Sequence, residues 1–355
     1  MTANPETRLL LCCARPDDNE ALAGPVNDLV QQGIDWEMLW ARSRHHRLWP
    51  LLHYRLEAIC PERLPNDFRR RLRGACRKNT RRNLEMTRQL ILLLEQFNDN
   101  GILAVPYKGP VLAMQVYRDL ALRHVGDLDI VVHRSDVPLA QTLLLNSGYE
   151  LALDGRPDTS YDWNKNYSFE FRKAETRIEI HWAFVKVRWA LPLVLYDLER
   201  RLSPVALGGR SINTFALEDL LLLLYLHGGK HNWGRLVWVA DFARVLVGAK
   251  TLDWGNVLER ANRLRVRRLL FLGMLMAHDL LAAEIPPLIW MQARRDKTAV
   301  KVAHTLQARL FEALPMYETD ERALYYFQVR ERALDKWPFI RYYFRRLLER
   351  WSVRR

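Results

Sequence analysis

The spacing of apolar residues changes twice along this 355-residue chain, and the two changes limit the folds that it can adopt. Up to about residue 98, and again after about residue 216, apolar residues recur at helical spacing. Between them, short segments alternate apolar and polar residues, as strands do. We therefore expect an α+β protein with a helical region over 1–98, a small mixed sheet over 99–215 and a second helical region over 216–355.

The composition excludes several classes of protein. Hydrophobic residues make up 49% of the chain and charged residues 27%, which excludes a disordered or fibrous protein. The 54 Lys and Arg residues outnumber the 41 Asp and Glu residues, so the net charge is +13 and favours an anionic partner. No apolar run approaches the ~20 residues of a membrane span, and no signal peptide is visible. Four cysteines without C-x-x-C spacing predict reduced thiols. We expect a cytoplasmic protein of open oligomeric state.

The helix before the sheet region is the best defined of the N-terminal part. Its apolar stripe consists of Met86, Leu90, Leu93, Leu94 and Phe97. The Asn-Asp-Asn-Gly segment at 98–101 ends it. Residues 69–82, just before the stripe, contain eight basic and no acidic side chains. This basic run is either a solvated helix face or a contact for a polyanion.

The most informative stretch is Asp-Leu-Asp-Ile-Val-Val at 127–132. Because successive side chains of a strand face opposite ways, Leu128 and Ile130 would enter the core while Asp127 and Asp129 share the polar face, ~7 Å apart. Two like charges at that distance need compensation, and a divalent cation such as Mg²⁺ supplies it through hard oxygen ligands. The alternative is a strand start with one capping and one solvated aspartate.

A third carboxylate is expected from a later strand. In the segment Thr-Arg-Ile-Glu-Ile-His-Trp at 176–182, Ile178 and Ile180 would fill the core, so Glu179 would lie on the polar face near the two aspartates. Glu170 is the competitor, because it stands on the partner strand of a hairpin around Ala174.

A basic glycine turn precedes the acidic strand. Lys108 and Gly109 follow a predicted strand over 102–107 and open a short helix, so the turn could face an anion. Arg123 stands four residues before the first aspartate, where it could hold a phosphate or form a structural ion pair.

Together these segments resemble the nucleotidyltransferases of the polymerase-beta-like superfamily. More narrowly, residues 107–150, Ile-Glu-Ile-His-Trp at 178–182 and the segment 227–246 resemble a poorly characterised bacterial nucleotidyltransferase family. The resemblance runs from about residue 30 to 250. The chain departs from the superfamily pattern at Pro110, where Ser or Gly usually follows the glycine, and in the long gap of residues 110–126.

The resemblance implies a nucleotidyltransferase domain that moves an NMP from an NTP such as ATP to an unidentified acceptor hydroxyl, with release of pyrophosphate. It implies that Asp127, Asp129 and Glu179 are catalytic and bind metal, with two Mg²⁺ ions. It further implies that the nucleotide-binding residues are Lys108, Gly109 and Arg123. Residues expected around the acceptor are His181, His227, Lys230, His231, Trp233 and Asp241.

Several alternatives remain open at this level. The acceptor is a small molecule, a protein or peptide, or RNA, and the preferred base is open. A catalytically silent module that binds nucleotide or nucleic acid has the same pattern. The basic and aromatic C-terminal segment 339–355 would suit a membrane-surface adaptor. His227 and His231 lie at metal-ligand spacing, but Gly228 stands where zinc peptidases have glutamate, so structural histidines are favoured.

Overall fold

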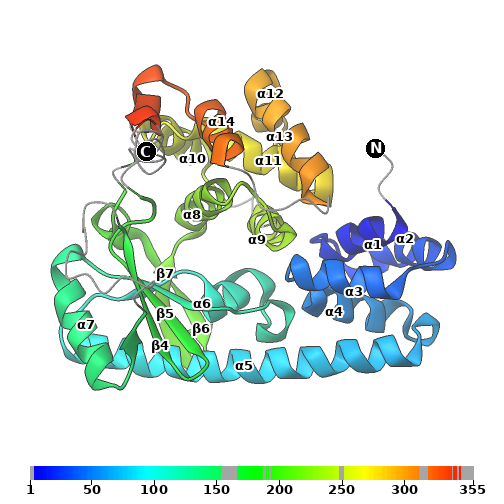
Figure 1. Ribbon diagram of the computed structural model, residues 1–355, viewed down its shortest axis with the longest axis horizontal. Helices are drawn as coiled ribbons and strands as arrows, with labels where there is room; N and C mark the ends of the chain where they lie inside the picture. Colours follow the sequence, from blue (N-terminus) through cyan, green and yellow to red (C-terminus); the bar gives the residue numbers. More distant parts are fainter. Residues whose placement is uncertain are drawn as a thin grey trace, which may run out of the picture.

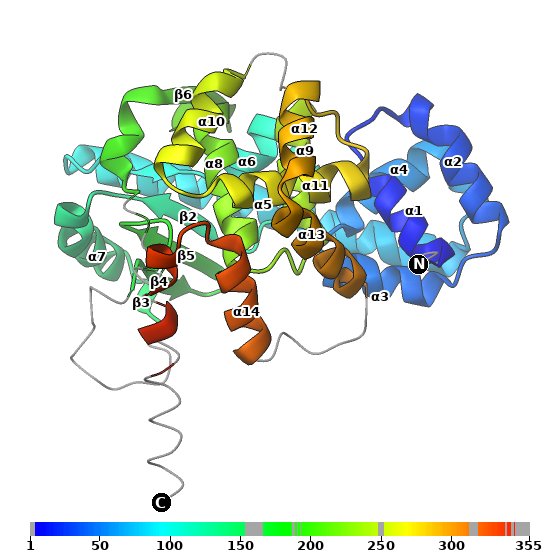
Figure 2. The same cartoon turned by 90° about the horizontal axis from the view of Figure 1, so that it is seen from above.

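The computed structural model describes residues 4–152, 166–186, 189, 191, 193–247, 252–311, 319–337, 339–341 and 344. The N-terminal part is helical, as predicted. Its first helices are α1 (Pro5–Ala14), α2 (Asn19–Gln31), α3 (Trp36–His45) and α4 (Trp49–Ile59). They gather at one end of the molecule, and the sheet lies at the other end (Figures 1 and 2).

The next helix, α5 (Asn66–Asp99), is 34 residues long and therefore spans ~51 Å. It runs along one side of the molecule, past the N-terminal helices and beneath the sheet (Figure 1). The predicted stripe on α5 is confirmed for Met86, Leu90 and Phe97, which are buried against the sheet. The basic run 69–82 forms most of the first half of α5, so the positive charge lies on the half of the helix that runs past the N-terminal helices.

The predicted mixed sheet is confirmed. Its strands are β1 (Val105–Pro106), β2 (Leu128–Val131), β3 (Glu150–Leu151), β4 (Ser168–Lys173) and β5 (Thr176–His181). Their order is β1-β2-β5-β4-β3; β2 and β5 are parallel and the other neighbours are antiparallel. Helices α5 and α7 (Val137–Asn146) cover one face, which leaves the opposite face for polar chemistry.

A second hairpin, β6 (Leu202–Leu207) and β7 (Arg210–Phe215), was not identified from the sequence. Its signal was present, because Gly208 and Gly209 have φ of +56° and +77° and form the tight turn that glycine pairs favour. The Thr214 hydroxyl donates to the Pro106 carbonyl oxygen at 2.6 Å, so the hairpin is fastened to β1.

The C-terminal part is helical, as predicted. After a short helix α6 (Gly109–Leu112) and a wide helical turn η2 (Ala113–Tyr117) within the sheet region, the later helices follow. They are α8 (Leu217–Lys230), α9 (Leu236–Val247), α10 (Trp254–Arg263), α11 (Arg267–Leu281), α12 (Pro287–Arg295), α13 (Lys297–Leu310) and α14 (Thr319–Val329). None of the described helices combines the length and the hydrophobicity of a membrane span. Most of the C-terminal segment 339–355 lies outside the described residues.

The turn after α8 buries Trp233 completely. A Cβ added to Gly228 would lie 2.6 Å from Cε3 of this indole, and one added to Gly273 of α11 would lie 3.1 Å from its Cζ2. The Trp233 ring also meets the ring of Phe242 edge-on, with centroids 5.8 Å apart. The observed contacts of Trp233 are therefore those of a core residue where α8, α9 and α11 meet.

This packing gives a stability prediction. Gly228→Ala should lower the free energy of unfolding by roughly 1–3 kcal/mol, because the added methyl group overpacks a rigid, buried indole. Chemical denaturation monitored by circular dichroism measures the change. Gly74→Ala is the matched control, because that position in α5 has no atom within 4 Å of an added Cβ. Equal stability of the two variants would contradict the prediction.

Candidate active site

The parallel pairing of β2 with β5 brings two of the predicted carboxylates together. Asp129 and Glu179 are direct register partners on the two strands. Asp129 is buried, with 3% of its surface exposed, and Glu179 is partly buried. Asp127 stands one residue before β2, and its Oδ2 lies 3.6 Å from Nη2 of Arg177. The sheet thus places Asp129 and Glu179 on adjacent strands, with Asp127 directly before the first of them; the side chains of Asp127 and Glu179 are exposed to a similar extent.

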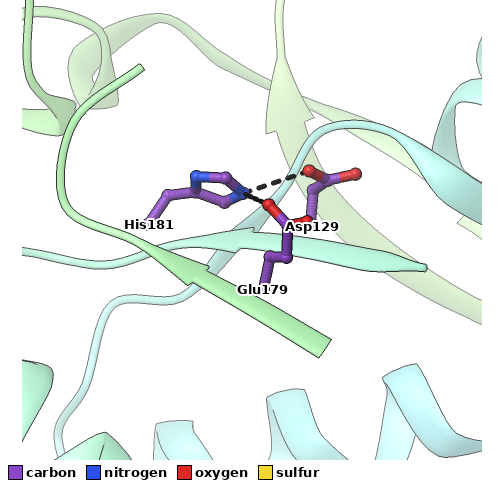
Figure 3. Close-up of side chains that lie close together, drawn as sticks. All are labelled: Asp129, Glu179 and His181. Atoms are coloured by element: carbon purple, nitrogen blue, oxygen red, sulfur yellow. Dashed lines mark hydrogen bonds and ion pairs between the residues drawn. The ribbon is translucent and has the colours of Figure 1, made fainter. Parts of the chain in front are cut away.

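His181 joins the carboxylates directly. Its Nε2 lies 3.0 Å from Oδ1 of Asp129 and 3.3 Å from Oε2 of Glu179 (Figure 3). The three side chains offer ligand atoms within 4.8 Å of one another. The alternation of β5 places His181 on the same face as Glu179, so the sequence contained this signal. Sequence reasoning had placed His181 only around the acceptor.

Electrostatics distinguish the two aspartates. Burial would raise the pKa of Asp129, but Lys108 and the hydrogen bond from His181 lower it well below its usual range. Burial and the neighbouring Asp129 raise the pKa of Asp127. Burial would lower the pKa of His181, but its hydrogen bonds to Asp129 and Glu179 raise it. Asp129 is therefore the firmly ionised centre of the cluster.

The donor set fits a divalent cation. Oδ2 of Asp129 is buried and has no hydrogen-bond partner among the described residues. A buried, ionised oxygen without a partner costs free energy, and a cation is the partner that a carboxylate oxygen accepts best. Asp129, Glu179 and His181 form the group that could share a metal ion within the described part of the chain.

Lys108 and α8 supply positive charge beside the acids. Nζ of Lys108 donates to Oδ1 of Asp129 at 2.6 Å and lies 3.5 Å from Nδ1 of His227. Burial, followed by Lys108, holds the pKa of His227 well below its usual range, so its imidazole is neutral. Nζ of Lys230 donates to the Tyr167 hydroxyl at 3.2 Å, and the Tyr167 ring stacks on His181. The sequence did not identify Tyr167.

The other predicted residues have different surroundings. Gly109 has a φ of +60°, and an added Cβ would lie 3.1 Å from the Asp127 carbonyl oxygen, so this turn passes directly against the acidic strand. The His231 ring contacts the rings of His227 and Trp238, with centroids 4.8 and 5.1 Å away, and those two rings also contact each other.

Of the two roles that the sequence left open for Arg123, the structure shows the structural ion pair. Its Nε and Nη2 each lie 2.9 Å from one carboxylate oxygen of Asp241. Tyr117 donates its hydroxyl to the same carboxylate at 2.7 Å. Both members of the ion pair are buried, so it links the start of the acidic strand to α9.

Paired carboxylates on one face of a small mixed sheet, with Lys108 beside them, are the type of donor set that metal-assisted phosphoryl transfer uses. A family model described as uncharacterised nucleotidyltransferase matches residues 32–282. The chain belongs to this family, which confirms the resemblance seen in the sequence. No curated protein matches the chain.

Two solved structures are similar in fold. The solution structure of the antibiotic-resistance factor ANT(2'')-Ia is 10% identical, with 62% of this chain and 96% of that chain covered and a TM-score of 0.30. The crystal structure of an antigenic nucleotidyltransferase-like protein from Paracoccidioides brasiliensis is 13% identical, with 58% and 97% covered and a TM-score of 0.35. At these TM-scores the likeness adds nothing to the family assignment.

Proposed function

We propose that the protein transfers an NMP from an NTP, such as ATP, to an acceptor hydroxyl and releases pyrophosphate. The observation that carries this proposal is the pairing of Asp129 with Glu179 across parallel strands, together with the buried Oδ2 of Asp129, which has no hydrogen-bond partner among the described residues. Family membership supports the same reaction. In the reaction, the acceptor oxygen attacks the α-phosphorus while the bond from the α-phosphorus to the pyrophosphate oxygen breaks.

We assign each residue of the site a separate role in this reaction. Asp127, Asp129 and Glu179 would hold Mg²⁺, which when bound neutralises phosphate charge and lowers the pKa of the acceptor hydroxyl. Glu179 would accept the proton of that hydroxyl. Lys108 and Lys230 offer ammonium groups to the departing pyrophosphate. Arg123 is left out of this assignment, because Asp241 engages its guanidinium in a bidentate ion pair.

One observation favours the silent binding module instead. Oδ1 of Asp129 already accepts from both Lys108 and His181, so the protein's own cations compensate part of the acidic charge. A module of this kind would bind nucleotide without cleaving it.

The deciding experiment measures pyrophosphate release. Purified protein is incubated with each of the four NTPs and Mg²⁺, in the presence of RNA, protein and small polyol acceptors. The proposal expects release that EDTA abolishes and that added Mg²⁺ restores. Nucleotide binding without pyrophosphate from any acceptor would favour the silent module, and absence of both binding and release would contradict the proposal.

Lys230 gives a pH prediction. Burial, followed by Lys108, lowers its pKa to about 8, so its positive charge is mostly present at pH 7 and mostly lost at pH 9. We expect affinity for a fluorescent ATP analogue to fall severalfold between these pH values. Lys230→Arg should keep most of its affinity, because arginine stays charged throughout this range. The same decline in both proteins would show that another group titrates.

A further inference from the structure

A second basic feature lies beside the acidic strand, on the side of the N-terminal helices. It is a pocket of about 430 Å³, and we call it the arginine pocket. Its cationic lining consists of Arg44, Arg47, Lys78, Arg82 and Arg235. No Asp or Glu lines the pocket, and within the described chain none of these five side chains forms an ion pair with a carboxylate. The nearby Asp127 carboxylate stabilises the charged forms of Arg47 and Arg235, but one carboxylate offsets only part of the charge of five cations. The cations therefore repel one another, and a bound anion would relieve that repulsion.

Arg47, Arg82 and Arg235 are partly buried, whereas Arg44 and Lys78 are exposed at the pocket. Nε of Arg82 donates to the Val125 carbonyl oxygen at 3.2 Å, and its Nη2 donates to that of Gly126 at 3.1 Å. Nη1 of Arg47 lies 3.3 Å from the position that a Cβ on Gly126 would take. Burial, followed by Arg235, lowers the pKa of Arg47 to about 10, so it remains charged at neutral pH. Arg47 and Arg82 therefore present fixed positive charge to the pocket.

The arginine pocket and Lys108 meet the acidic strand at different points. Gly126, which contacts Arg47 and Arg82, immediately precedes Asp127. Lys108 instead contacts Asp129 and approaches His227 of α8. Two separate basic surfaces thus flank one set of acids. A transfer reaction needs two such surfaces when both the nucleotide and the acceptor are phosphorylated.

We propose that the arginine pocket holds a phosphate group of the acceptor, so that the acceptor is a phosphate ester. This proposal rests on the proposed function, which assigns the lysine side to the triphosphate. Guanidinium groups suit the site, because they bind phosphate oxygens in pairs. One wall is aromatic: the Trp49 ring lies 4.6 Å from the ring of His124, which burial holds neutral with a pKa of about 3.

The phosphate could belong to a small ester or to a nucleic acid. The two differ in whether the acceptor also contacts α5. A small phosphate ester would occupy the arginine pocket alone. A single-stranded nucleic acid would continue along α5, where a second basic hollow of about 520 Å³ is lined by Arg70, Arg73 and Arg77. From Arg70 to Arg82 the helix rises ~18 Å, the length of a few nucleotides.

The test uses the full-length protein without metal and two probes, a fluorescein-labelled ten-nucleotide single-stranded RNA and ribose 5-phosphate. Anisotropy measures the first and calorimetry the second. The double variant Arg47→Gln with Arg235→Gln should bind both probes at least ~10-fold more weakly, because two charge-assisted contacts are lost. Its affinity for the fluorescent ATP analogue should stay within about twofold. Arg295→Gln with Lys301→Gln, on exposed positions of α12 and α13, controls for the loss of two charges.

The source of the phosphate follows from a third variant. Arg70→Gln with Arg77→Gln should weaken RNA binding if the acceptor is a nucleic acid, and should leave both probes unaffected if it is a small ester. Unchanged binding of both probes by the Arg47 and Arg235 variant would overturn the proposal. An equally large loss of affinity for the fluorescent ATP analogue would overturn it too. These measurements need no turnover, so a protein that releases no pyrophosphate would contradict the proposed reaction without affecting this result.

Discussion

Asp129→Asn is expected to reduce nucleotidyl transfer by about 1,000-fold or more while the protein stays folded. The substitution keeps the shape of the side chain but removes the charge on the buried oxygen that has no partner and on the oxygen that Lys108 and His181 share. Both the proposed metal ligation and the positioning of Lys108 depend on that charge. Pyrophosphate release under single-turnover conditions measures the loss, and a thermal melt checks the fold.

Glu170→Gln is the matched control for this variant. Glu170 is the register partner of Glu179 on β4, and it pairs with Arg172 at 2.7 Å rather than with the cluster of Asp129, Glu179 and His181. We expect nearly unchanged turnover. Asp129→Asn with more than a tenth of the wild-type rate would contradict the catalytic assignment. A loss in Glu170→Gln as large as that in Glu179→Gln would transfer the role of third acid to Glu170.

Asp241→Ala is expected to lower the free energy of unfolding by roughly 3–5 kcal/mol. The variant leaves the buried guanidinium of Arg123 without its bidentate partner and the Tyr117 hydroxyl without its acceptor. An unpaired charge that is shielded from water is among the most destabilising single changes in a folded protein. Urea denaturation followed by fluorescence measures the change.

The control for this prediction is an ion pair whose side chains are exposed to solvent, whereas those of Arg123 and Asp241 are buried. Asp67→Ala removes a carboxylate that pairs with Arg70 on α5, where both side chains are at least 80% exposed, and it should leave stability unchanged within error. If Asp241→Ala were as stable as the wild type, the ion pair would not be structural. Arg123 would then return as a candidate for nucleotide binding.

Local patterns predicted the parts of this molecule that depend on neighbours in sequence. The alternation around Asp129 gave a strand with a buried side, and the spacing around Leu90 gave the apolar stripe of α5. The contact between His181 and Asp129 joins residues 52 apart and depends on the register of two parallel strands, which no local pattern encodes. The pairing of Arg123 with Asp241, 118 residues apart, depends likewise on how α9 meets the sheet.

The arginine pocket was also beyond local reasoning. The sequence showed the basic run on α5, but it could not show that Arg47 from the junction of α3 and α4, and Arg235 from the start of α9, lie beside it. By contrast, the hairpin turn at Gly208 and Gly209 was a readable signal.

The long helix α5 determines which shortened versions of this chain would keep both the acids and the arginine pocket. Its first half lies with the N-terminal helices and its second half lies under the sheet, and the arginine pocket takes side chains from α5 and from both neighbours. A shortened chain that begins at α5 would retain the acids of β2 and β5 but lack Arg44 and Arg47. Activity screens on such a minimal core would therefore test the chemistry without two of the five cations that we propose hold the second substrate.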